Sequence, residues 1–320
     1  MIHQFKPSKY YFTFGPNEPA YRIKPGDTIV TSTVDARGFD ENLQPIPEEK
    51  KHKENGVRFY EGNPLVGPFF VEGTEPGDAL KIEIEQVRPN RETAWSTIRP
   101  HFGSLTEEVP GRRLLLNEPL PNKRYIWKLD LKRNVGILEL SDSQIREVKV
   151  PLQPFIGSIG VAPAYGRIEP ASTPGEYGGN MDCVETKEGA TLYLPVFVHG
   201  AYLAFGDVHA AQGDGELCGT ALEVSANVRL RIEVVKGWEI NWPRIEDEEY
   251  IMVAGSSRPL MEAYKIAHVE LLSWLVNDYG FDKWEAIQVL SQVGTCRIGN
   301  VVDPNYTVVA KFPKKYLTSN

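Results

Sequence analysis

One segment of the chain, residues 191 to 199, is apolar on both of its alternating faces. It reads Thr-Leu-Tyr-Leu-Pro-Val-Phe-Val-His, so an extended conformation would place apolar side chains on both sides of a sheet. The pattern predicts an interior strand, and Pro195 marks an edge or a bulge because proline cannot donate to a strand ladder. A strand of this kind needs other elements packed over both of its faces.

Most of the remaining periodic segments also indicate strands. Residues 80 to 85 and 228 to 234 alternate apolar and charged side chains, which is the period-two pattern of half-buried strands. Apolar residues recur at helical spacing only in residues 258 to 279 and 282 to 293, where Asp282 is the expected N-cap. We therefore predict a mainly β chain in which two helices form a hairpin near the C-terminus.

These elements divide the sequence into three expected regions. Residues 1–150 form an N-terminal β-rich domain, and residues 151–254 form a second β-rich portion that carries the most polar motif of the chain. Residues 255–320 contain the helical hairpin, which we expect to pack on the β core as an α+β portion.

Charge and hydropathy exclude several classes of partner. The 320 residues carry a net charge of −8, whereas nucleic-acid binding draws on clustered Lys and Arg. No window approaches the roughly 20 apolar residues needed to span a bilayer. We expect a cytoplasmic protein that acts on a small neutral or cationic molecule, without a nucleic-acid or membrane partner.

The motif at residues 206–216, Gly-Asp-Val-His-Ala-Ala-Gln-Gly-Asp-Gly-Glu, concentrates functional groups. It contains His209, the carboxylates Asp207, Asp214 and Glu216, and the amide Gln212. We expect it in a loop between two strands, because unpaired carboxylates are costly to bury. A metal ion would compensate their charge, and the alternative is an acidic, glycine-rich hairpin loop that faces water.

Other polar residues sit where strands end. Asp35 follows a β-branched run, Asn180 and Asp182 follow two glycines, and His101 lies in an expected loop. Each has a structural alternative, since Asp and Asn are common turn formers and a lone loop histidine is often structural.

Several stretches together resemble the acetamidase/formamidase family. Beside the motif at 206–216, they are Val71-Glu72-Gly73-Thr74-Glu75-Pro76-Gly77-Asp78, Ile159-Gly160-Val161-Ala162-Pro163, Gly178-Gly179-Asn180-Met181-Asp182 and Leu194-Pro195-Val196. The resemblance implies metal-assisted hydrolysis of short aliphatic amides, such as formamide or acetamide, to a carboxylic acid and ammonia. It also implies a jelly-roll-like β-sandwich with an additional β-barrel-like module.

For this chemistry we assign roles to the candidate residues. His209 is the firmest metal ligand, with Asp35, Asp182 and Asp207 as carboxylate partners. Glu216 is the expected general base and later proton donor. Asp214 is the alternative general base, and His101 is a further catalytic candidate. Gln212 and Asn180 are expected to bind substrate. Zinc is favoured, with calcium or manganese as alternatives, and we expect a homo-oligomer, a dimer or tetramer.

Two other functions remain open at this point. Cys183 or Cys218 could act as the nucleophile of an amidase, and such an enzyme would survive chelation but not thiol alkylation. A non-hydrolytic, cupin-like β-sandwich that binds a metal or a small ligand would also fit a polar loop of this kind. Cupin-like sites normally use two or three histidines, however, and this motif has one.

Overall fold

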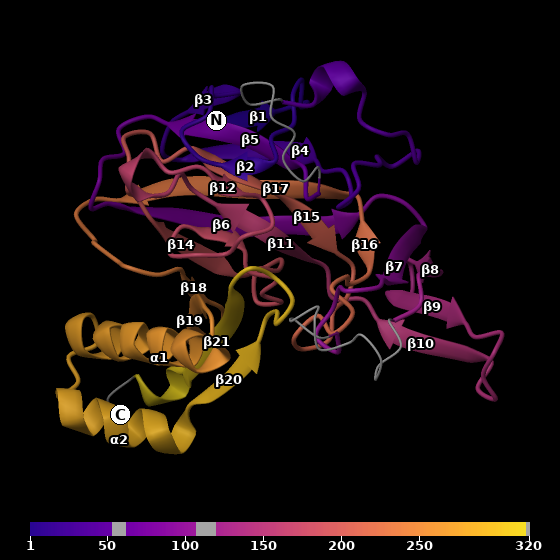
Figure 1. Cartoon of the computed structure of the whole chain (residues 1–320). Helices are drawn as coiled ribbons and strands as arrows, with labels where there is room; N and C mark the ends of the chain where they lie inside the picture. Colours follow the sequence, from indigo (N-terminus) through magenta and orange to yellow (C-terminus); the bar gives the residue numbers. More distant parts are fainter. Residues whose placement is uncertain (53–61, 107–119, 318–320) are drawn as a thin grey trace.

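The computed structural model describes residues 1–52, 62–106 and 120–317 of the chain. Figure 1 shows stacked β-sheets with two helices on one side, and this arrangement confirms the predicted mainly β fold. Two large sheets contain almost all of the strands in these residues.

The first sheet has the order β1-β4-β17-β6-β14-β18-β19-β21-β20. Its strands are β1 (Ile2–Gln4), β4 (Asp27–Ser32), β17 (Ala226–Val235), β6 (Ala79–Pro89), β14 (Thr191–Pro195), β18 (Arg244–Glu246), β19 (Tyr250–Ser257), β21 (Tyr306–Pro313) and β20 (Thr295–Ile298). The strand predicted from residues 191 to 199 is therefore interior, since β14 pairs with β6 on one side and β18 on the other.

The second sheet has the order β10-β9-β8-β7-β16-β15-β11-β13, and β5 pairs with both β15 and β3. These strands are β10 (Glu147–Pro151), β9 (Val135–Glu139), β8 (Lys123–Asp130), β7 (Thr93–Ile98), β16 (Glu223–Val224), β15 (Leu203–His209), β11 (Phe155–Gly160), β13 (Gly178–Asn180), β5 (Leu65–Val71) and β3 (Tyr21–Ile23). A small third sheet pairs β12 (Glu169–Pro170) with β2 (Thr13–Phe14).

The two large sheets enclose one apolar core. A continuous buried cluster contains Ile82 and Leu230 of the first sheet together with Ile156 and Phe205 of the second. This face-to-face packing is the expected sandwich. The expected barrel is not observed: both sheets end in unpaired outer strands, and no closed barrel forms within residues 1–52, 62–106 and 120–317.

The expected regions 1–150 and 151–254 do not form separate sheets. In the first sheet β17 lies between β4 and β6, and in the second sheet β15 pairs with β5. Each sheet therefore combines strands that are more than a hundred residues apart in the sequence, and both halves of the chain must be present to build either sheet.

The helices are α1 (Leu260–Asn277) and α2 (Lys283–Val293), close to their predicted bounds. Asp282 caps α2 as expected, because its carboxylate accepts hydrogen bonds from the backbone N–H groups of Trp284 and Glu285. The helix α1 packs on β19 and β21, as Figure 1 shows. Gly255 permits this approach, since a Cβ there would lie 2.6 Å from the Ala263 oxygen. No helix in the described part of the chain is long and apolar enough to cross a membrane.

Candidate active site

The motif at residues 206–216 begins inside the sandwich rather than in an exposed loop. Strand β15 extends to His209, and Asp207 and His209 are both fully buried. The expectation of a loop was wrong for these two residues because the apolar neighbours Phe205 and Val208 hold the strand in the core. The site is therefore built on a rigid strand.

Three acidic residues at the site have left-handed backbone conformations. Their φ angles are 47° at Asp182, 53° at Asp207 and 51° at Glu216. Such conformations are unfavourable for residues with a Cβ and persist where the surrounding structure enforces them, often at functional sites. At Asp207 the conformation takes the residue out of the ladder, since the pairing of β15 with β11 omits it between Val208 and Gly206.

Each of three carboxylates near His209 has one anchored oxygen and one buried oxygen with no hydrogen-bond partner. Asn63 donates to Asp207 Oδ2 at 2.8 Å, Asn180 to Asp182 Oδ2 at 3.0 Å, and the Ala221 amide to Glu223 Oε1 at 3.0 Å. The other oxygens, Asp207 Oδ1, Asp182 Oδ1 and Glu223 Oε2, have no partner. Buried polar atoms without partners are rare and require an explanation.

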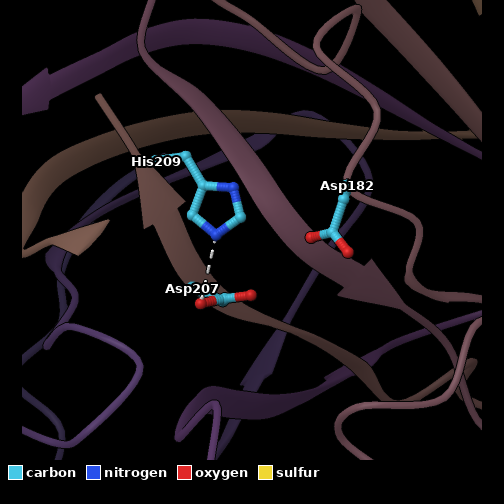
Figure 2. Close-up of side chains that lie close together, drawn as sticks. All are labelled: Asp182, Asp207 and His209. Atoms are coloured by element: carbon cyan, nitrogen blue, oxygen red, sulfur yellow. Dashed lines mark ion pairs between the residues drawn. The ribbon is translucent and has the colours of Figure 1, made fainter. Parts of the chain in front are cut away.

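Two of the unpartnered oxygens lie beside one nitrogen of His209. Nε2 lies 3.5 Å from Asp207 Oδ1 and 3.5 Å from Glu223 Oε2. Ligand atoms of Asp182, Asp207 and His209 lie within 4.8 Å of one another, and so do those of His209, Glu216 and Glu223. Figure 2 shows the imidazole beside both carboxylates, with its lower nitrogen paired to Asp207 and Asp182 to its right. One nitrogen and several carboxylate oxygens form a mixed N/O set that suits a divalent cation.

Gly157 leaves the space between these carboxylates open. A Cβ at this position would lie 2.7 Å from the Asp207 backbone oxygen and 2.9 Å from Asp182 Oδ1. Any larger side chain would therefore enter the region where the unpartnered oxygens converge. The donor set and the open space both fit a bound metal ion.

Gln212 fixes the orientation of His209. Its amide nitrogen donates to the backbone oxygens of Asp182 and Gly299, both at 2.9 Å. Its oxygen must then face His209 Nδ1, 2.9 Å away, so Nδ1 carries a proton and donates. Nε2 is consequently the nitrogen that faces the carboxylates, and the side chain of Gln212, expected to bind substrate, is hydrogen-bonded to the imidazole and to two backbone oxygens.

We expect Gln212→Leu to weaken metal affinity by about 10–100-fold, the usual effect of losing a partner that orients a metal-binding histidine. The variant removes the acceptor for Nδ1 and leaves the ring free to take the other tautomer. Titration of the metal-free protein with zinc, followed by calorimetry, measures the change. Gln153→Leu, which replaces an exposed glutamine side chain, should bind zinc like the unmodified protein, and equal affinity in both variants would contradict this role.

The electrostatic potential at the site is strongly negative. Burial alone would lower the pKa of His209, but the charges of Glu223 and Asp207 raise it well above its usual value. Burial raises the pKa of Asp182 and of Glu216 well above the ordinary range, and it raises the pKa of Asp303 to about 7. In the absence of a metal ion, protons therefore occupy groups that a cation would otherwise neutralise.

A cavity of about 140 Å³ opens beside the cluster. Glu216, Glu223, Asp207 and Asp303 line it, together with Ala36, Arg37, Asn63, Trp95, Arg99, Phe102, Ser172, Asn180, Gly219, Thr220, Val302 and Pro304. The volume is below the roughly 300–1,000 Å³ typical of sites for drug-sized ligands. It suits a substrate with few non-hydrogen atoms.

Comparison with known proteins identifies the family to which this site belongs. The model of the Acetamidase/Formamidase family matches residues 14–170 and 167–318. The chain belongs to the acetamidase/formamidase family. The resemblance predicted from the sequence is thereby confirmed, and the cupin-like alternative is not supported.

Members of the family resemble the chain over different lengths. The crystal structure of acetamidase from Yersinia enterocolitica has a TM-score of 0.84 at 35% identity, covering 100% of this chain and 94% of that one. The acetamidase of Mycolicibacterium smegmatis is 26% identical over 54% of this chain and 53% of its own length. The formamidase of Methylophilus methylotrophus is 25% identical over 67% of this chain and 61% of its own length. The chain thus matches less than two thirds of the length of these last two relatives.

Asp35, expected as a family metal ligand, lies outside the cluster. Its carboxylate is buried, but Oδ2 accepts from Arg91 at 2.7 Å and from Trp95 at 2.9 Å. Its Oδ1 accepts hydrogen bonds from the backbone N–H groups of Arg37 and Phe39. Because both oxygens have partners and a guanidinium neutralises the charge, Asp35 stabilises the turn after β4 and is not available to a metal ion.

Two expected catalytic residues also lie elsewhere. The Asp214 side chain is 53% exposed and pairs with Arg297, so it does not join the buried carboxylates. His101 is exposed and does not line the cavity. Of the two catalytic carboxylates considered in the motif, only Glu216 lines the cavity beside His209.

Asn180 is part of the site, although not as a free binding group. Its amide nitrogen donates to Asp182 and, at 2.7 Å, to Asp303 Oδ2, while its oxygen accepts from Asn63 at 2.9 Å and from Ser158. All its hydrogen-bonding atoms are therefore used to hold the acidic residues in place.

Glu223 and Asp303 belong to the cluster, although neither was predicted from the sequence. Glu223 lies opposite His209 in the pairing of β15 with β16, and a charged residue in the apolar run Ala221 to Val224 could have indicated a site. Asp303 lies in a turn-rich segment between β20 and β21. Its sequence, Asp-Pro-Asn, resembles an ordinary turn, so no local signal distinguishes it.

The cysteines are poorly suited to nucleophilic catalysis. Cys183 is buried and donates to Glu185 at 3.2 Å. Burial raises its pKa well above the usual value, and burial also raises the pKa of Cys218. Since the thiolate is the reactive form, neither residue has the environment of an activated nucleophile.

Proposed function

We propose that this chain hydrolyses short aliphatic amides to a carboxylic acid and ammonia with the help of a divalent cation. His209, Asp182, Asp207 and Glu223 would hold the cation. The observation that carries the proposal is the grouping of three buried carboxylates around His209, each with one unpartnered oxygen, two of which lie 3.5 Å from its Nε2. Zinc is the first choice, because calcium prefers six to eight oxygen ligands and no imidazole.

Such a cation would supply Lewis-acid chemistry, lowering the pKa of a bound water and polarising the amide carbonyl. Glu216 is the general base in this proposal. Its side chain is buried and lines the cavity. The raised pKa lets it take a proton from the attacking water and return it to the departing nitrogen. The products leave as carboxylic acid and ammonia.

The direct test is ammonia release from formamide, acetamide, propionamide and benzamide. We expect turnover of the smallest amides, loss of activity after exhaustive chelation, and recovery on addition of zinc. The small cavity predicts little or no turnover of benzamide. Full activity after verified removal of all metal would refute the metal dependence, and no ammonia from any amide would refute the activity.

The proposal also predicts how pH changes stability. The acids with raised pKa bind more protons in the folded than in the unfolded state, and so does His209. Stability of the metal-free protein should therefore fall as pH rises from about 4 toward 7, the pKa of Asp303. A cation must displace these protons, so it should stabilise the protein more at pH 8 than at pH 5.5.

Thermal unfolding with and without zinc measures this difference. At about 100 times the dissociation constant, the added stability should be about 2.7 kcal/mol. His209→Ala should lose most of the zinc effect. Equal stabilisation at both pH values, or an unchanged effect in His209→Ala, would contradict the proposed site.

A further inference from the structure

Arg37 and Arg99 both line the acidic cavity, and Arg99 pairs with none of its carboxylates. Arg99 follows β7 and lines the cavity together with Asp207, Glu216 and Glu223. It forms no ion pair with the described residues, and its Nε is buried without a hydrogen-bond partner. A buried guanidinium nitrogen left in this state is unfavourable unless a ligand supplies an acceptor.

Packing holds this arginine in place. Its guanidinium lies 4.3 Å from the centroid of the Phe102 ring, and the backbones of Arg99 and Phe102 form a bridge. The ring is itself fixed, because a Cβ on Gly219 would lie only 2.2 Å from it. The guanidinium is thus oriented by an aromatic contact that leaves its donors unused.

Arg91 provides a contrast within the same region. Its guanidinium is buried, and its donors are taken by Asp35 at 2.7 Å, by the Thr93 oxygen at 2.8 Å and by the Asp40 oxygen at 3.1 Å. This is the pattern of an arginine that stabilises the fold. Arg99 has none of these partners, although four carboxylates line the same cavity.

The chemistry of the unused donors defines the ligand. A guanidinium only donates hydrogen bonds, so its partner must be an oxygen that carries negative charge or develops it. In amide hydrolysis that oxygen is the acyl oxygen, which is a carbonyl in the substrate, an oxyanion in the tetrahedral intermediate and part of a carboxylate in the product.

We propose that Arg99 is a catalytic residue that binds the acyl oxygen, and that short carboxylates inhibit the enzyme by occupying the same position. This inference rests on the proposed amide hydrolysis. It assigns the two ends of the substrate to different groups: Glu216 serves the departing nitrogen and Arg99 serves the oxygen. The product should therefore bind through Arg99 even when no amide is present.

The test compares Arg99→Met and Arg99→Lys with Arg124→Met. Arg124 is a matched control, because its guanidinium also lies over an aromatic ring, 5.2 Å from the Trp95 centroid, but it does not line the cavity. Arg99→Met should lower kcat/KM for acetamide by about 10²–10³-fold, mainly through kcat. It should also weaken competitive inhibition by acetate at least about tenfold. Arg99→Lys should recover part of the kcat/KM and part of the acetate inhibition. Arg124→Met should have the kcat/KM and the acetate inhibition of the unmodified protein.

A second measurement separates this inference from the proposed function. Acetate should raise the midpoint of thermal unfolding of the zinc-loaded protein, and this shift should be lost in Arg99→Met but kept in Arg124→Met. If amides are hydrolysed and Arg99→Met keeps both kcat/KM and acetate inhibition within twofold, the role of Arg99 is wrong and the proposed function stands. If no amide is hydrolysed, the proposed function fails. The acetate shift then decides whether Arg99 binds carboxylates, and Arg99→Lys decides the question if Arg99→Met does not fold.

Discussion

His209→Ala is expected to lower the rate of ammonia release from acetamide by at least about a thousandfold and to abolish stoichiometric metal binding. The imidazole is the one nitrogen ligand of the cluster, and three carboxylates with unpartnered oxygens surround it. Without it, Asp207 and Glu223 would face each other with no intervening cation. Metal analysis of the purified variant, together with the rate of ammonia release, measures both effects.

Glu216→Gln should separate metal binding from proton transfer. We expect it to retain the metal while losing about 10²–10⁴-fold in kcat, because the amide side chain cannot accept a proton from water. His199→Ala is the control, since this histidine is exposed and pairs with Glu75 away from the site. Full activity in both His209→Ala and Glu216→Gln, with native circular dichroism, would show that the proposed mechanism is wrong.

Glu270→Ala is expected to lower the free energy of unfolding by about 3–5 kcal/mol. The Glu270 carboxylate on α1 accepts from Arg244 on β18 at 2.8 Å and 3.0 Å, and both side chains are about 95% buried. Removing the acid leaves the guanidinium beneath the helix with a weak contact to Asp278 at 3.4 Å and with the rings of Trp238 and Trp274, each 5.0 Å away, but with no buried carboxylate. Urea unfolding followed by fluorescence measures the loss.

An exposed ion pair provides the comparison for this variant. Glu188→Ala removes the partner of Arg88 at the surface, and we expect a change of about 0–1 kcal/mol. Replacing both buried partners, Arg244→Met with Glu270→Leu, should recover much of the lost stability because no unpaired charge remains. A loss below about 1 kcal/mol in Glu270→Ala would show that the helix does not depend on this pair.

The elements with strong local patterns were predicted well. The capping residue Asp282, the two helices and the interior strand β14 follow from periodicity and residue type, which act over a few neighbouring positions. Such local patterns do not specify the order of the strands within a sheet. That order depends on pairing between residues more than a hundred positions apart, as between β17 and β6.

The candidate site shows the same division. His209, Asp207 and Glu216 stand in one motif, and Asp182 stands in a second, so residue chemistry alone could nominate them. Asp35 had a similar local context, but Arg91, which neutralises it, comes from the turn between β6 and β7, 56 positions away. Asp214 belongs to the motif and yet turns outward to Arg297.

The sequence by itself determined the mainly β class, the helical hairpin, the family and the motif that carries His209 and Glu216. Only the tertiary structure decided which carboxylates face the imidazole. It brought in Glu223 through cross-strand pairing and Asp303 through a distant turn, and it showed Gln212 to be the partner of His209. The physical reason is that the charge of a buried acid is set by the groups packed around it. Those groups come from other strands and turns, and the local sequence around the acid does not specify which of them pack against it.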